Sequence, residues 1–351
     1  MIHLFSPTIR RKEMDAVLTC MVDEKIGPGE LSTRLTDAAK DFFSAEGAVA
    51  LRSPVRALEC ALEACALPPD SGVILSALAP AWHYEAVLRA GCKPLVLDVS
   101  ADTPWISAQS AVEGIRAGGR AVALHEPLGM LPDMADFTAL GVPVIEDASQ
   151  SVGAAWDGRK TGTFGVYTVV GLEERHSVTA GGGALLLAAA SGGVNSPAPR
   201  VKRDWAALKK AVNGSFPEDL LPDINSALAM VQLKEFARNE ERRREIRETY
   251  VKALMQSRHK TFAPDDAVES AVYGFPVVLS SGFKDVKHYA ERKDVAVEPA
   301  FERSIVSIYR DCAAECPHAD SLAMRCVLFP LYPLLSGEQI LTVARVLSTI
   351  P

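Results

Sequence analysis

The sequence lacks an excess of basic residues, a long apolar run and a paired-cysteine motif, and each absence excludes a class of protein. Its 37 Lys and Arg residues against 44 Asp and Glu give a net charge of −7, which predicts no surface for nucleic acid or anionic lipid. Apolar runs such as Ala184–Ala190 are too short to span a membrane, and the N-terminus has no signal-peptide pattern. The seven cysteines form no CxxC pair, which favours reduced thiols in a cytoplasmic protein.

Two local clusters also fall short of known site motifs. Cys312, Cys316 and His318 are close in sequence, but their spacing is not a zinc pattern, and buried thiols are expected instead. Gly181–Gly183 forms a tight turn that is neither a Walker loop nor a dinucleotide-binding GxGxxG. The sequence therefore predicts no metal site and no nucleotide-phosphate loop.

The chain does contain short apolar runs that alternate with amphipathic segments. Seven runs read as strands without strict alternation, as expected for strands buried on both faces of a mostly parallel sheet; they are 48–51, 73–76, 94–99, 121–125, 142–146, 167–170 and 184–187. Helical patterns lie between them, at 55–65, 82–90, 108–117 and 134–140. This rhythm predicts an α/β domain with helices on both faces of a seven-stranded sheet.

A second, smaller domain is expected after a long helical pattern that begins at Ile224. The charge-dense stretch Asn239–Glu245 reads as the solvated face of that helix. Past Leu254, mixed strands and helices predict an α+β unit. The expected division is a large domain over residues 1–235 and a small domain over 236–351, with a Gly/Ser/Pro-rich loop at Ala188–Pro199.

Five ordered blocks carry a resemblance to a known family. They are Gly91–Asp98, His125 with Gly129, Asp133 and Met134, Val144–Ala154 with the turn at Gly181–Gly183, Leu221–Leu228, and Leu328–Pro333. Together they resemble the signatures of the DegT/DnrJ/StrS-type sugar aminotransferases, which are fold-type-I enzymes dependent on pyridoxal phosphate (PLP). The resemblance covers nearly the whole chain. It implies a PLP-transferase-like large domain and, in its active members, a catalytic lysine.

The lysine position holds an arginine in this chain. Counting back from Gly183 places Arg175 where the family has its lysine and Val170 where it has a serine. An arginine side chain stays protonated and cannot form a Schiff base. One branch of the family replaces the lysine with histidine and acts as a sugar dehydratase, so His176 is a minority candidate for a general base. A shift of one residue in a strand would turn that side chain to the opposite face.

The resemblance also implies a vestigial cofactor site. It places Asp147 at the pyridine nitrogen and Gln150 near the ring's 3′ oxygen, although a buried Asp can equally cap a helix or brace a loop. The phosphate would meet the helix start at Ser53 and Arg56, where Pro54 removes an N–H and Val55 a hydroxyl. Covalent PLP binding is not expected, and non-covalent binding is doubtful.

Two further positions depart from the family pattern. Acidic residues at Glu218-Asp219 stand near the place of an Asn-x-Arg that family members donate across the dimer. Pro80 stands at the place of the aromatic residue that stacks on the ring, where Trp82 would substitute if the register differs. A lone histidine such as His83 is more often solvated or hydrogen-bonded than a ligand.

Three functions remain open at this point. The favoured one is a non-catalytic homologue that binds a sugar-nucleotide-like ligand or a protein partner; the others are a PLP-dependent or PMP-dependent sugar dehydratase or aminotransferase, and a structural subunit beside an active paralogue. A homodimer is expected, with Gly27–Gly29 and the first helices at its interface. The site should persist as a cleft, with Arg175 turned toward Asp147 or another carboxylate.

Overall fold

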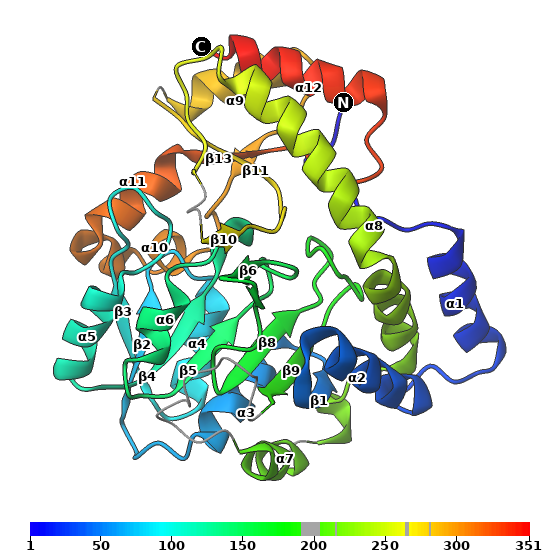
Figure 1. Ribbon diagram of the computed structural model, residues 1–351, viewed down its shortest axis with the longest axis vertical. Coiled ribbons are helices and arrows are strands. Elements are labelled where there is room, and N and C mark those ends of the chain that lie inside the picture. The colour runs from blue at the N-terminus through cyan, green and yellow to red at the C-terminus, as the bar shows by residue number, and fades with distance from the viewer. Residues whose placement is uncertain (191–203, 215, 264–266, 281) are drawn as a thin grey trace.

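The central element is a seven-stranded sheet, as expected. The computed structural model describes residues 1–190, 204–214, 216–263, 267–280 and 282–351 (Figure 1). The sheet order is β1-β9-β8-β5-β4-β2-β3, and its strands are β1 (Ala45–Leu51), β2 (Gly72–Ser76), β3 (Lys93–Leu97), β4 (Gly119–His125), β5 (Val144–Asp147), β8 (Tyr167–Gly171) and β9 (Ala184–Ala189). Only β9 pairs antiparallel with both of its neighbours. All seven predicted strands are confirmed within a few residues of their expected ends.

Helices cover both faces of this sheet. One face packs against α3 (Pro54–Ala64), α4 (Ala81–Arg89) and α7 (Trp205–Asn213). The other face packs against α2 (Glu30–Phe43), α5 (Ala108–Arg116), α6 (Met134–Thr138) and the first half of α8 (Asp223–Leu254). Every residue of β2, β5, β8 and β9 is buried, which explains why these strands read as continuous apolar runs.

The carboxyl ends of the parallel strands meet at one edge. His125 at the end of β4 lies opposite Asp147 at the end of β5, and Asp147 lies opposite Val169 in β8. The helix α4 starts shortly after β2 ends, with Pro80 as its N-cap. In open α/β sheets, ligands and functional side chains gather at this edge.

A second apolar core lies beyond the middle of α8. It joins the end of α8 with α9 (Phe283–Glu291), α12 (Gly337–Thr349) and a sheet of order β11-β13-β12, formed by Phe275–Val278, Cys326–Phe329 and Glu298–Pro299. Ile2 also packs in this core and bridges to Val295. The expected division at 235/236 falls inside the continuous helix α8, whose two halves serve the two cores (Figure 1).

Smaller elements complete the described chain. The helix α1 (Arg11–Val22) packs along α8, and a small sheet joins β6 (Ala155–Trp156), β7 (Arg159–Lys160) and β10 (Val268–Glu269). The remaining helices are α10 (Ile305–Ile308), α11 (Pro317–Arg325) and the 3-10 turns 127–129, 217–219 and 310–315. The expected loop at Ala188–Pro199 begins inside β9, and its residues from 191 onward lie outside the described chain. Among the described residues, no helix is both long and apolar enough to cross a membrane.

Candidate functional site

Asp147 is the centre of a buried hydrogen-bond network. Its side chain is 3% exposed. One carboxylate oxygen, Oδ2, lies 2.8 Å from His83 Nε2 and 2.8 Å from His125 Nδ1. The other oxygen, Oδ1, accepts from the backbone N–H of Ser149 at 3.1 Å and from the Ser149 hydroxyl. Asp147 therefore braces the loop after β5, and both of its oxygens are engaged.

The charges in this network are set by burial and by the two histidines. Burial disfavours a carboxylate, but the hydrogen bonds from His125 and His83 outweigh that cost and hold the pKa of Asp147 well below its usual value. Burial lowers the pKa of His83, although Asp147 opposes the shift. His83 is thus neutral at physiological pH and donates from Nε2, while its buried Nδ1 has no hydrogen-bond partner among the described residues.

His83 reaches Asp147 from the first turn of α4. Its side chain is 1% exposed, and its ring lies 4.1 Å from that of Trp82. The sequence favoured a solvated or hydrogen-bonded histidine over a ligand, and in the structure His83 is hydrogen-bonded. The identity of its partner could not be predicted, because His83 and Asp147 are 64 residues apart along the chain and lie on different elements.

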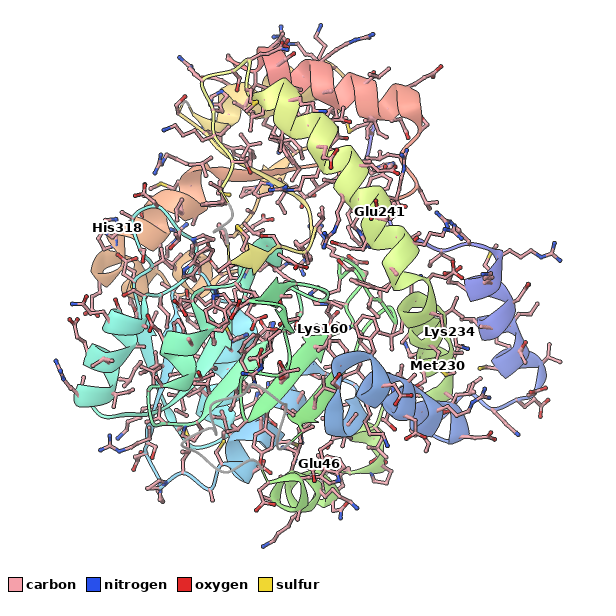
Figure 2. All side chains as sticks on the ribbon, in the orientation of Figure 1. Glu46, Lys160, Met230, Lys234, Glu241 and His318 are labelled. Carbon is pink, nitrogen blue, oxygen red and sulfur yellow. The ribbon has the colours of Figure 1, made fainter. Side chains whose placement is uncertain are left out.

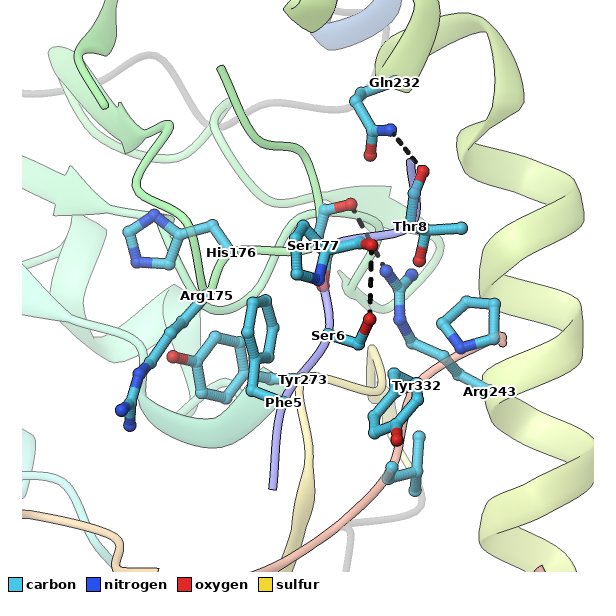
Figure 3. A pocket seen from close by; sticks show the side chains of 13 residues that line it. Phe5, Ser6, Thr8, Arg175, His176, Ser177, Gln232, Arg243, Tyr273 and Tyr332 are labelled. Atoms are coloured by element: carbon cyan, nitrogen blue, oxygen red, sulfur yellow. Dashed lines mark hydrogen bonds between the residues drawn. The ribbon is translucent and has the colours of Figure 1, made fainter. Parts of the chain in front are cut away.

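Arg175 and His176 lie side by side in the loop after β8 but make different contacts (Figure 3). Arg175 Nη1 lies 2.7 Å from Glu298 Oε2 in the C-terminal unit, and both side chains are partly exposed. The expected carboxylate partner is therefore Glu298 rather than Asp147, and its hydrogen bond raises the pKa of the Arg175 guanidinium. His176 Nδ1 accepts from the Glu173 N–H at 3.2 Å. Burial lowers the pKa of His176 to about 4, so its ring is neutral.

The residues expected at a phosphate are occupied by contacts within the chain. The Ser53 hydroxyl caps α3 by accepting from the Val55 N–H at 3.1 Å. Arg56 forms ion pairs with Glu59 and Glu63, and its Nε lies 3.6 Å from Asp219 Oδ2. Three carboxylates therefore surround the Arg56 guanidinium.

Gln150 and Val170 also have structural roles. Gln150 Oε1 accepts from the Leu128 N–H at 2.8 Å, and Leu128 has a left-handed backbone with φ of 58°. This bond supports a strained turn beside the sheet edge. Val170 lies in the apolar core between the sheet, α2 and α8. A valine there contributes packing and offers no hydroxyl.

Two pockets lie near these residues. The first, next to Arg175 and His176, has a volume of about 10 Å³ and reaches Arg243 of α8 (Figure 3). It has room for about one water molecule. The second has about 320 Å³ and lies between Phe42, Phe236 and Lys160. Arg175 lines the first pocket, but neither pocket is lined by Asp147, Gln150, Ser53 or Arg56, so neither matches the cleft expected around all five residues.

The cluster near the end of the chain does not join this site. His318 lies on α11 at the periphery of the molecule (Figure 2), where its backbone N–H donates to Asp98. Cys316 is buried, as expected, and the side chain of Cys312 lies outside the described part of the structure.

The sheet order and the carboxyl-edge Asp define a protein of the PLP-dependent transferase fold. The sequence profile of the DegT/DnrJ/EryC1/StrS aminotransferase family matches residues 7–348, so the chain belongs to that family. A curated relative, the dTDP-4-dehydro-2,3,6-trideoxy-D-glucose 4-aminotransferase of Saccharopolyspora spinosa, is 25% identical over 98% of this chain and 95% of its own length.

Solved structures confirm the fold. The putative sugar aminotransferase Spr1654 of Streptococcus pneumoniae in its PLP form aligns with a TM-score of 0.88 at 18% identity, over 99% of this chain and 98% of its own. The E. coli GDP-4-keto-6-deoxy-D-mannose-3-dehydratase with bound hydrated PLP gives 0.83 at 16% identity, over 99% and 100%. A solved aminotransferase and a solved dehydratase therefore share this architecture.

Proposed function

We propose that this chain is a non-catalytic member of its family that uses the fold to bind a sugar-nucleotide-like ligand or a protein partner. The observation that carries the proposal is the His83 ring bonded to Asp147 Oδ2. In the family, this carboxylate is expected to face the pyridine nitrogen of PLP. Here an imidazole of the same chain takes that bond.

The residues present do not fit PLP in three respects. Asp147 has no oxygen without a protein donor, since His83, His125 and Ser149 engage both. The candidate phosphate cation, Arg56, is paired with carboxylates. The Schiff-base position holds Arg175, which pairs with Glu298.

The dehydratase alternative depends on His176. Its neutral ring has the protonation state of a general base, and its electrostatic neighbours include Asp147 and His125. A base contributes to catalysis only when the reacting group is held within hydrogen-bond reach. The loss of the phosphate contacts and the engagement of Asp147 argue against such a held group.

The alternative of a supporting subunit depends on residues given to a partner's site. The Glu218-Asp219 segment stands near the expected place of the donated Asn-x-Arg, and Asp219 lies close to Arg56 of its own chain. A carboxylate there would repel a phosphate in a partner's site. The binding role of the first proposal remains the better supported.

The test is a titration of the purified protein with PLP, followed by absorbance between about 320 and 430 nm and by dialysis. We expect the spectrum of free PLP only, and complete loss of PLP on dialysis. Spr1654 treated in parallel serves as the positive control, since it is known in a PLP form. Retention of about one PLP per chain with a shifted band would overturn the proposal.

A further inference from the structure

The two histidines and the carboxylate at the sheet edge form a set of metal-ligand atoms. His83 Nε2, His125 Nδ1 and Asp147 Oδ2 all lie within 4.8 Å of one another. They come from α4, β4 and β5, and each side chain is at most 3% exposed. Buried imidazole and carboxylate groups in such a cluster are the ligands that Zn²⁺ and other divalent first-row ions use in proteins.

The surroundings of Asp147 orient the carboxylate for this purpose. Oδ1 is held by the backbone N–H and hydroxyl of Ser149. The Ser149 oxygen in turn accepts from the Gly171 N–H at 2.7 Å. Oδ2 is directed at the two histidines. Carboxylates that bind a metal ion in proteins are commonly held by hydrogen bonds of this kind.

The neutral His83 ring can change its tautomer without losing a hydrogen bond at Nδ1. In the hydrogen-bonded form, Nε2 carries the proton, and Nδ1 has no partner in the part of the chain that the structure describes. A metal ion needs the lone pair of Nε2, so the proton must move to Nδ1. Because no donor now holds Nδ1, the change of tautomer breaks no existing contact there.

The distances allow an ion after a small displacement. Both nitrogens lie 2.8 Å from Oδ2, whereas ligands at about 2.0–2.1 Å from a tetrahedral zinc lie about 3.3 Å apart. Each nitrogen–oxygen contact must therefore open by about 0.5 Å, which requires a small shift of both imidazole rings relative to Asp147.

We propose that His83, His125 and Asp147 bind a divalent first-row transition ion such as Zn²⁺, with a water molecule at the fourth position. This inference rests on the proposed function in one respect, because Asp147 must not face a PLP ring. The ion ties α4 to the ends of β4 and β5. The proposal departs from the expectation of no metal site, which the sequence favoured because the three ligands are too widely spaced along the chain to form a motif.

The test uses untagged, full-length protein treated with a chelator and then titrated with Co²⁺ or Zn²⁺. We expect one ion per chain, a visible Co²⁺ absorption typical of tetrahedral or five-fold coordination, and an X-ray absorption spectrum of the Zn²⁺ form with nitrogen and oxygen ligands only. His83→Gln should weaken Zn²⁺ binding at least about 10-fold. The control His288→Gln, at an exposed histidine of α9, should leave the affinity unchanged.

Three results would overturn the proposal: no stoichiometric binding, equal affinity in His83→Gln, or sulfur ligands, which would point to the buried cysteines. If His83→Gln does not fold, the X-ray absorption of the unaltered protein decides the question alone. Titration with PLP in the same samples separates the two ideas. Bound PLP would refute the proposed function. If neither PLP nor a metal ion binds, only the metal-site proposal is refuted.

Discussion

Replacing Arg175 with lysine should not by itself give a PLP-binding protein. A lysine at this position can react only with a cofactor that is already held. Pro54 has no N–H to offer a phosphate, and Val55 already donates its own N–H to Ser53. Val170 offers no hydroxyl and is enclosed by apolar side chains. The added amine would therefore meet no bound aldehyde.

The magnitude follows from these missing contacts. A hydrogen bond to a charged group contributes about 1.5–3 kcal/mol, so three absent ones weaken phosphate binding by about 4.5–9 kcal/mol. That range corresponds to at least about 10³-fold in affinity. His83 adds a further obstacle, because PLP must displace its ring from Asp147.

The assay is absorbance between about 320 and 430 nm after PLP addition and gel filtration. Arg175→Lys and the control Arg175→Ala should both elute without a PLP band. We expect a band only when Arg175→Lys is combined with Pro54→Gly, Val55→Thr, Val170→Ser and His83→Thr. Thermal unfolding of each variant checks that Val170→Ser has not disrupted the core. A stable band from Arg175→Lys alone, near neutral pH, would refute the reasoning and favour an intact cofactor site.

Two other predictions concern acid stability and assembly. Because burial lowers the pKa of His176 from 6.5 to about 4, its contribution to stability is full above about pH 6.5 and is lost as the pH falls toward 4. The full difference amounts to about 3.4 kcal/mol. Because the residue is partly exposed, we expect the free energy of unfolding to fall by about 2 kcal/mol between these two pH values in urea unfolding. His176→Phe should abolish this part of the pH dependence. The α1 helix exposes an apolar stripe at the expected dimer interface, made of Met14, Leu18, Met21 and Val22. Leu18→Glu should give monomers by light scattering, whereas the control Leu341→Glu, at an exposed leucine of α12, should remain a dimer. If the unaltered protein is itself a monomer, the expected dimer interface is wrong.

The sheet could be predicted from the sequence because most of its inner strands are buried along their whole length. Strands such as β2 and β8 are buried along their whole length, so each appears as a short apolar run between amphipathic segments. No range was expected for α2, although its buried residues Leu35, Ala39 and Phe43 recur at helical spacing. The packing of Ile2 into the C-terminal core could not be predicted, because one apolar residue has no periodicity.

The sequence could place several candidate site residues on elements of the fold, but it could not predict their contacts. Family motifs located Asp147, Gln150 and Arg175, and the structure places each at the sheet edge or in its loops. The partners were not predictable, since Glu298 lies 123 residues from Arg175 along the chain. Pairings of this kind depend on how the elements of the two cores pack together in three dimensions. Neither the hydrophobic pattern nor local propensity predicts that packing.

The network around Asp147 gives this carboxylate a structural role that does not depend on a cofactor. A buried, ionised carboxylate without donors costs several kcal/mol. With His83, His125 and Ser149 as donors, the same carboxylate has a pKa well below its usual value, so its interactions stabilise the fold above the acid range. A pyridinium nitrogen or a metal ion would meet the same electrostatic need. The identity of the group opposite Asp147, rather than the presence of Asp147, therefore decides whether this edge of the sheet serves catalysis, metal binding or stability alone.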